Sequence, residues 1–202
     1  MEHVTTLSED SLSGRSTGRG ATFFTSLALI GFVALLAAPR LAESELSLIS
    51  GENVDAALEL AHDREEILWF ARAIYSESEF TEEQYYIAWA IRNRVGSPNY
   101  PDTYEEVVLQ PHQFSGLNPY DQWYEVNISR DYGVGDAVWE SALAVAREVY
   151  HAPEDERLLP SDALHFYSPV AVATPGWAMG RAPVETLHGR RGIRFAFYAG
   201  VE

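Results

Sequence analysis

An uncharged apolar run near the amino end constrains this chain more than any other feature. Residues 21–38 read ATFFTSLALIGFVALLAA and contain no charged side chain. These 18 residues lie at the lower limit for a helix that crosses a bilayer, which needs about 20. Arg15 and Arg19 precede the run and Arg40 follows it, which favours an amino end inside and a remainder outside. A membrane anchor, a cleaved signal peptide and a buried core helix all fit the run, and the first two export the rest of the chain.

The composition excludes several classes of function. The 202 residues carry 30 acidic and 14 basic side chains, for a net charge of -16, and every basic residue is an arginine. Such a chain would be repelled by the phosphates of nucleic acids, so we expect no nucleic-acid partner. The absence of cysteine rules out disulfides and thiolate catalysis. His112, His165 and His188 are too scattered for a metal motif, so we predict neither a metal nor a cofactor.

These patterns divide the chain into four parts. We assign residues 1–20 to a polar segment, 21–38 to the anchor or signal, 39–62 to a linker with a short helix, and 63–202 to one compact domain. The last part is about the size of an ordinary single domain.

Helical spacing dominates the compact domain. Asp63, followed three residues later by Glu66, forms a capping-box pattern, and the apolar residues after it predict a helix over 64–76. Thr81 and Gln84 form a second such pattern before a helix that should end at residues 96–98, which read GSP. A third helix is predicted over 137–150.

Strand signals are confined to the carboxyl-terminal part. Ile193, Phe195 and Phe197 alternate as on one face of a strand, and residues 163–167 could form another. Residues 96–136 are rich in Pro, Gly, Asn and Tyr and predict an irregular region with a short helix near Tyr104. We therefore expect an α+β domain made mainly of helices.

Two carboxylates lie between the first two predicted helices. Glu77 and Glu79 are two residues apart, so in an extended linker only one of them faces a cleft. A glutamate that loses hydration next to buried aromatics has a raised pKa and can serve as a general acid. A solvated glutamate is the ordinary alternative for either residue.

Three further groups could bind a polar ligand. Gln113 and Ser115 offer neutral hydrogen-bonding groups on a loop, or form an ordinary turn. His165, Tyr167 and Trp177 could stack on sugar rings, or serve in the core. Aromatic residues also gather in a polar loop, where they form a groove wall or a surface patch: Tyr120, Trp123, Tyr124 and Tyr132.

Taken in order, these segments resemble the cell wall hydrolase family typified by the catalytic domain of spore cortex-lytic enzymes of the SleB type. The resemblance covers residues 64–198 and rests on the segments ARAIYSE (71–77), IAWAIRNRV (87–95), QFS (113–115), HFYSP (165–169), PGW (175–177) and a closing aromatic strand over 192–198. Serine stands at positions 76 and 78, where the family often has Gly and Ala.

The resemblance implies a mainly helical, lysozyme-like domain that cleaves the glycan strands of peptidoglycan, in the manner of a lytic transglycosylase. The family's catalytic glutamate falls on Glu77, which would act first as acid and then as base. Gln113 and Ser115 would line the sugar site, with His165 and Tyr167 on the opposite wall and Trp177 nearby.

Two other functions share the same groove. One is a module that binds peptidoglycan in the cell envelope without cleaving it. The other is a phage endolysin tethered to the membrane. With residues 21–38 retained, we expect the catalytic domain outside the cytoplasmic membrane; with that run cleaved, we expect secretion.

Overall fold

The computed structural model describes residues 51–133 and 135–201. The predicted membrane segment, residues 21–38, lies outside this part of the chain. Among the described residues, no helix has both the length and the apolar character needed to cross a membrane. From Asp55 onward the described chain forms one compact unit.

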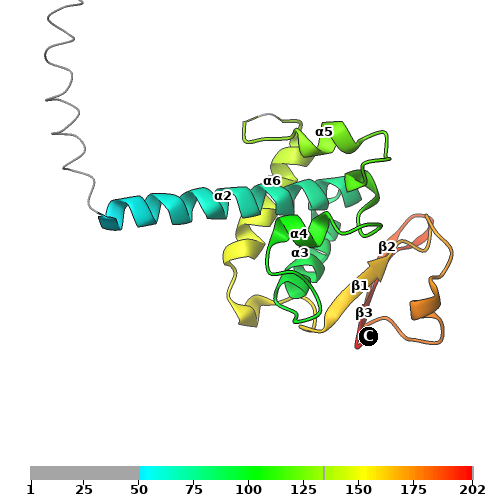
Figure 1. The fold of residues 1–202 in the computed structure, drawn as a ribbon. Coiled ribbons are helices and arrows are strands. Elements are labelled where there is room, and N and C mark those ends of the chain that lie inside the picture. Colours follow the sequence, from blue (N-terminus) through cyan, green and yellow to red (C-terminus); the bar gives the residue numbers. More distant parts are fainter. Residues whose placement is uncertain (1–50, 134, 202) are drawn as a thin grey trace, which may run out of the picture. The chain divides into compact units, whose positions relative to one another are not determined.

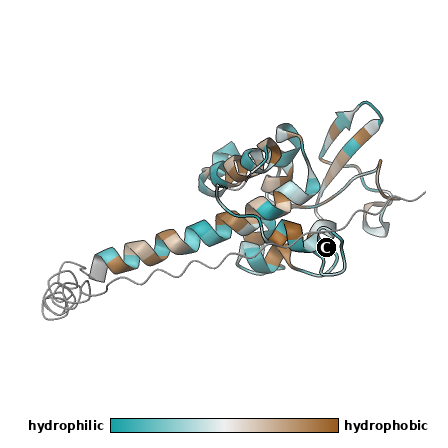
Figure 2. Cartoon of the chain, turned by 90° about the horizontal axis from the view of Figure 1, so that it is seen from above, coloured by the Kyte–Doolittle hydropathy of each residue, from teal (hydrophilic) through white to brown (hydrophobic). Residues whose placement is uncertain are grey.

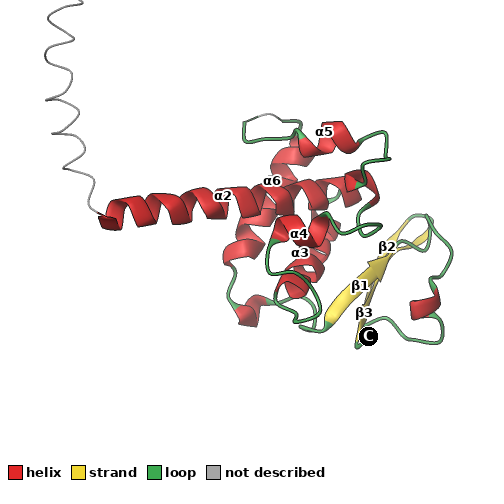
Figure 3. Cartoon of the chain, viewed as in Figure 1, coloured by secondary structure: helices red, strands yellow, loops and turns green. Residues whose placement is uncertain are grey.

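This unit is mainly helical with a small antiparallel sheet (Figures 1 and 3). The longer helices, α2, α3 and α6, come first and the strands β1, β2 and β3 follow. The elements are α2 (Gly51–Glu77), α3 (Thr81–Val95), α4 (Tyr104–Val108), η1 (Ser115–Leu117), α5 (Tyr124–Ile128), α6 (Ala137–His151), η2 (Glu154–Glu156), β1 (Ala163–Tyr167), η3 (Gly176–Ala178), β2 (Glu185–Gly189) and β3 (Gly192–Ala199).

Helix α2 begins earlier than its predicted start at residue 64. Residues 53–62 are exposed, and hydrophilic and hydrophobic colours alternate along them (Figure 2). Asp63 lies inside the helix, where its carboxylate accepts a hydrogen bond from Tyr150 Oη at 2.7 Å, so it caps nothing. Ala, Leu and Glu favour helix on both sides of Asp63, and no Gly or Pro interrupts them.

The core forms where α2, α3 and α6 meet. Fully buried side chains from these helices include Phe70, Ile74, Ile87, Ile91 and Trp139. Their three- and four-residue spacing produces the buried stripe that each helix turns inward.

Helix α3 has the predicted limits but not the predicted cap. Phe80 precedes the first helical residue, and no side chain caps the helix there. The Thr81 hydroxyl instead pairs with Ser141 at 2.8 Å, and the Gln84 amide donates to the Ser78 carbonyl at 2.9 Å. The capping box therefore does not form, because both of its side chains are used in tertiary contacts.

The sheet has the order β1-β3-β2, with antiparallel neighbours. Two register shifts interrupt it: one skips Leu164 in β1 and the other skips Arg194 in β3. Phe195 and Phe197 belong to the main core, as predicted. Ile193 packs on a second cluster with Ala196 and Tyr198, because a bulge breaks the alternation of the strand.

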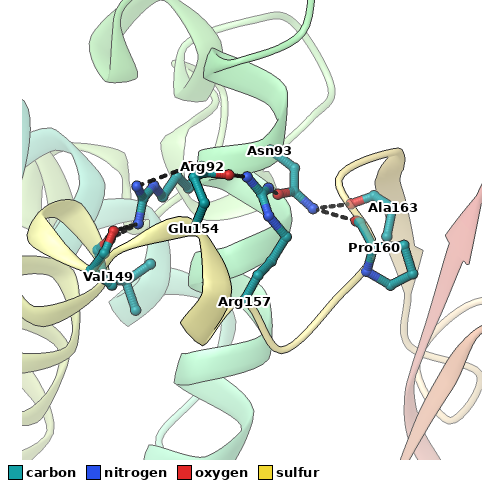
Figure 4. A network of polar contacts seen from close by, with 8 residues as sticks. Arg92, Asn93, Val149, Glu154, Arg157, Pro160 and Ala163 are labelled. Carbon is teal, nitrogen blue, oxygen red and sulfur yellow. Dashed lines mark hydrogen bonds and ion pairs between the residues drawn. The ribbon is translucent and has the colours of Figure 1, made fainter.

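A polar network fastens β1 to α3 (Figure 4). Asn93 donates from Nδ2 to the carbonyl oxygens of Pro160 at 2.8 Å and Ala163 at 3.2 Å. Arg157 contacts Asn93 Oδ1 and also pairs with Glu154. The chain that enters β1 is thus held to the carboxyl-terminal end of α3.

Candidate active site

The turn between α2 and α3 is held by Ser78. Its backbone N–H donates to the Ile74 carbonyl at 3.2 Å, and its hydroxyl accepts from the Phe80 N–H at 3.1 Å. The same hydroxyl donates to the Glu83 carboxylate at 2.5 Å. These bonds fix residues 76–80, and with them the two candidate carboxylates.

The two carboxylates of this turn have different surroundings. Glu79 is exposed, whereas Glu77, at the last position of α2, is partly buried. Burial raises the pKa of Glu77 to about 7, and the neighbouring Arg94 acts in the opposite direction. With a pKa of about 7, this carboxyl group is present in both its protonated and its ionised form near neutral pH.

Arg94 connects segments that are distant in the sequence. It is only 3% exposed and donates from Nε to the Leu164 carbonyl at 2.7 Å, at the bulge of β1. Its guanidinium carbon lies 5.4 Å from the ring centroid of Phe114 and 5.6 Å from that of Phe166. Burial lowers the pKa of Arg94, and Glu77 is among the groups that counter this effect.

A pocket of about 480 Å³ opens beside the turn. It is lined by residues from the end of α2, from η1, from α5 and from the start of α6: Tyr75, Ser76, Glu79, Ser115, Gly116, Asp121, Trp123, Val126, Asn127, Arg130, Asp136 and Val138. Glu77 is not among them, although its neighbour Ser76 and the nearby Glu79 are. The cleft-facing acid of the pair is therefore Glu79, and the sheltered one is Glu77.

Close packing of Gly116 against the side chains of Asn127 and Ser76 brings Ser115 to this pocket. A Cβ added to Gly116 would lie 2.8 Å from Asn127 Nδ2 and 3.0 Å from Ser76 Cβ. Only glycine leaves enough room there, and the Asn127 amide donates to the Gly116 carbonyl at 2.9 Å. The η1 segment is thus pressed against the end of α2.

Arg130 and Asp136 form a charged part of the pocket wall. They pair at 3.2 Å, and the Arg130 guanidinium stacks 3.7 Å from the centroid of the Tyr75 ring. Asp136 also caps α6 by accepting from the Trp139 N–H at 2.9 Å, and this backbone hydrogen bond is the largest cause of its lowered pKa.

His165, Tyr167 and Trp177 gather in an aromatic cluster on the sheet. The Trp177 ring centroid lies 5.2 Å from that of His165 and 5.8 Å from that of Tyr167. Burial lowers the pKa of His165, with Arg94 and Arg181 acting in the same direction. A neutral imidazole is therefore favoured at position 165.

The structure brings the sequence candidates together only in part. Ser115 lies in the pocket beside Ser76, while Gln113 is exposed and does not line that pocket. His165, Tyr167 and Trp177 do not line that pocket either, although Arg94 acts electrostatically on the pKa of both Glu77 and His165. Of the loop aromatics, Trp123 lines the pocket, and Tyr120 is 98% exposed.

Sequence reasoning missed Arg94, Arg130 and Asp136 as members of this region. Arg94 stands in one of the segments that carry the family resemblance, but nothing in its spacing indicates burial among aromatic rings. Among the described residues, no group of His, Asp and Glu could hold a metal ion.

Comparison with known proteins decides the family. The sequence model of the cell wall hydrolase family matches residues 78–190, more than half of the chain. The chain belongs to the cell wall hydrolase family. The matched span begins directly after Glu77 and contains Arg94, Ser115 and His165.

Two individual proteins of known name are also similar. A spore cortex-lytic enzyme of Oceanobacillus iheyensis is 26% identical over 130 residues, which are 62% of this chain and 40% of that enzyme. The match therefore spans less than half of the relative's length. The catalytic domain of the germination-specific lytic transglycosylase SleB from Bacillus anthracis is 22% identical, with a TM-score of 0.45 over 65% of this chain and 92% of that domain.

Proposed function

We propose that this protein cleaves the glycosidic bonds of peptidoglycan glycan strands and that Glu77 is its general acid. One observation carries the proposal: burial raises the pKa of Glu77 to about 7, in a turn that forms one wall of a 480 Å³ pocket. Membership of the cell wall hydrolase family supports the substrate class. The name of the similar spore cortex-lytic enzyme supports it as well.

The chemistry follows from one carboxyl group used twice. The protonated Glu77 gives its proton to the glycosidic oxygen as the bond between that oxygen and the anomeric carbon breaks. The resulting carboxylate then removes the proton from the 6-hydroxyl of the same sugar, whose oxygen bonds to the anomeric carbon and closes an anhydro ring. Glu77 ends the cycle protonated, and no water is consumed.

Glu77 is preferred over Glu79 because only Glu77 is sheltered from solvent. Burial raises the pKa of Glu77 to about 7, so part of the Glu77 population holds a proton near neutral pH, as a general acid must. For Glu77 to act, its carboxyl group must reach the sugar past Ser76 and Glu79, which line the pocket. Glu79, Asp121 and Asp136 also lie in the lining and could instead activate a water molecule, which would give a hydrolysed end.

Product analysis tests this proposal. The purified full chain is incubated with peptidoglycan sacculi, and the soluble products are analysed by mass spectrometry. We expect anhydro-muropeptides, which lack one water relative to hydrolysed products. Hydrolysed ends would contradict the single-carboxylate mechanism, and co-sedimentation with no cleavage would indicate a binding module.

We also propose that residues 21–38 tether the protein to the cytoplasmic membrane with the catalytic domain outside. The uncharged run and the arginines before it support this orientation. Fractionation of expressing cells tests it: the full chain should stay with the membranes, and deletion of 21–38 should release it. A full chain found intact in the soluble fraction contradicts the tether.

A further inference from the structure

A second pocket, of about 650 Å³, lies between the start of α3 and the β2–β3 hairpin. Its lining is basic on the hairpin side and also contains two carboxylates: Phe80, Glu82, Glu83, Val170, His188, Gly189, Arg190, Arg191 and Arg194. Three of the 14 arginines of the chain thus fall within five consecutive residues. The protein has a net charge of -16, so this basic segment has the opposite sign to the chain as a whole.

Arg194 is already engaged in contacts with other residues of the pocket wall. It pairs with the buried carboxylate of Glu83, with Nη2 donating to Oε2 at 3.1 Å, and its guanidinium lies 4.6 Å from the centroid of the Phe80 ring. The register shift in β3 skips Arg194, and a bulge of this kind redirects a side chain. A Cβ on Gly189 would lie 2.6 Å from Arg194 Cδ, so a larger residue at that position would displace the Arg194 side chain.

Arg190 and Arg191 are the two basic residues left for a ligand. They form the two-residue turn between Gly189 and Gly192, which pair across the hairpin, and both are exposed. Within the described part of the chain, neither makes an ion pair, whereas Glu83 is already paired with Arg194. The lining thus carries three arginines against two glutamates, and the pocket keeps an excess of positive charge.

The second pocket lies close to Glu77 along the chain, so an anion bound in it could belong to the polymer that Glu77 cleaves. Phe80 lies three residues after Glu77, so their Cα atoms are at most about 11 Å apart. The two pockets thus adjoin the same turn, one through Ser76 and Glu79 and the other through Phe80 and Glu83. A single polymer bound at Glu77 could contact both of them.

We propose that the hairpin pocket binds the carboxylate groups of the peptide stems carried by the glycan strand. This rests on the proposed function, because it assigns the second pocket to the same substrate. Arginine suits the task, since its planar guanidinium matches a carboxylate with two parallel hydrogen bonds. The strand would then be held by its sugars on one side of the turn and by its stems on the other.

A binding experiment in the cleavage-deficient background tests the site. The full chain with Glu77→Gln is titrated with soluble glycan strands, released from sacculi by an endopeptidase, that carry their stems, and with the same strands after an amidase has removed the stems; fluorescence anisotropy measures the binding. We expect tighter binding to the stem-bearing form. Arg190→Gln combined with Arg191→Gln should weaken that binding about tenfold, equivalent to about 1.4 kcal/mol, and abolish the preference. Arg147→Gln, which removes an exposed arginine from α6, should leave both binding constants unchanged.

Three results would overturn the proposal. One is equal binding of the parent to both forms of glycan, and another is an equal loss on both forms in the double variant. The third is loss of the preference when phosphate-containing polymers are stripped from the sacculi, because the anion would then be a phosphate. Failure of the unsubstituted chain to cleave sacculi would instead contradict the proposed function, and the binding result would stand apart from it.

Discussion

Glu77 and Glu83 are both sheltered carboxylates of the segment formed by α2, the turn and α3. They differ in whether hydrogen bonds and an ion pair compensate the negative charge. Glu83 accepts a hydrogen bond from the Ser78 hydroxyl and forms an ion pair with Arg194, so its negative charge is compensated within the fold. Glu77 has only the electrostatic influence of Arg94 against its burial. Glu83 thus holds the β2–β3 hairpin to α3, whereas Glu77 can bind and release a proton near neutral pH.

The largest expected effect comes from removing the exchangeable proton. Glu77→Gln should lower the rate of sacculus cleavage by at least about 100-fold, the usual range for loss of a general acid. Release of soluble muropeptides over time measures the rate, and circular dichroism checks that the variant is folded.

Glu79→Gln is the matched control, because it makes the same chemical change two residues away. We expect it to retain most of the cleavage rate. Equal losses in the two variants would mean that the pocket-facing Glu79 shares the chemistry, and an active Glu77→Gln chain would remove Glu77 from it.

Removing the charge of Glu83 should lower the stability of the fold. Glu83→Gln leaves Arg194 without its counter-charge, but the Arg194 side chain is 35% exposed and water solvates it in part, so we expect a loss of about 1 kcal/mol of stability. Urea denaturation of the full chain measures the change. Glu82→Gln, an exposed neighbour, serves as the control and should change the free energy of unfolding little. Equal effects of the two substitutions would show that the Arg194 contact does not matter.

The raised pKa of Glu77 should also make the stability of the fold depend on pH. Because the pKa of Glu77 is raised in the fold, the native state binds its proton more tightly than the unfolded chain does. The free energy of unfolding should therefore decrease as pH rises from about 4.5 to about 7, by up to about 3 kcal/mol. In Glu77→Gln this component should vanish, so that the variant is more stable than the parent above pH 7. Parallel pH profiles for the two chains would contradict the burial of Glu77.

A smaller effect is expected from Arg94, which lowers the pKa of Glu77 while burial raises it. Cleavage by the parent should decline above about pH 7 as Glu77 loses its proton. Arg94 lowers the pKa of Glu77, so Arg94→Gln should move this decline to higher pH. Arg94→Lys keeps the charge and should keep the parental profile even if stability falls. An unchanged profile in a folded Arg94→Gln chain would show that Arg94 has only a structural role.

The sequence predicted α3 and α6 well, because each buries a regular apolar stripe, whereas the early start of α2 was missed because its first residues are exposed and bury no stripe. The limits of α3 and the strand over 163–167 agree with the structure. Strand β2 and the five-residue α5 were missed, since neither contains a long enough run for periodicity to show. The capping boxes at Asp63 and Thr81 failed because tertiary contacts, invisible in a local pattern, use those side chains.

The site was less accessible to prediction than the fold. Glu77 could be named through the family resemblance, but its sheltering depends on elements that follow it in the sequence. Arg94 meets Phe114 and Phe166, which lie 20 and 72 residues further along the chain. Local spacing cannot encode such a meeting, and the same holds for the pairing of Arg194 with Glu83.

The Asn93 network of Figure 4 has a consequence for how such an enzyme could vary. Asn93 holds the residues leading into β1, and the next residue, Arg94, holds Leu164. The gap between the helix that carries Arg94 and the strand that carries His165 is therefore set by hydrogen bonds to main-chain oxygens. Side chains along β1 can change while that spacing persists, so related proteins could vary the exposed surface of the strand and keep the same distance between helix and strand.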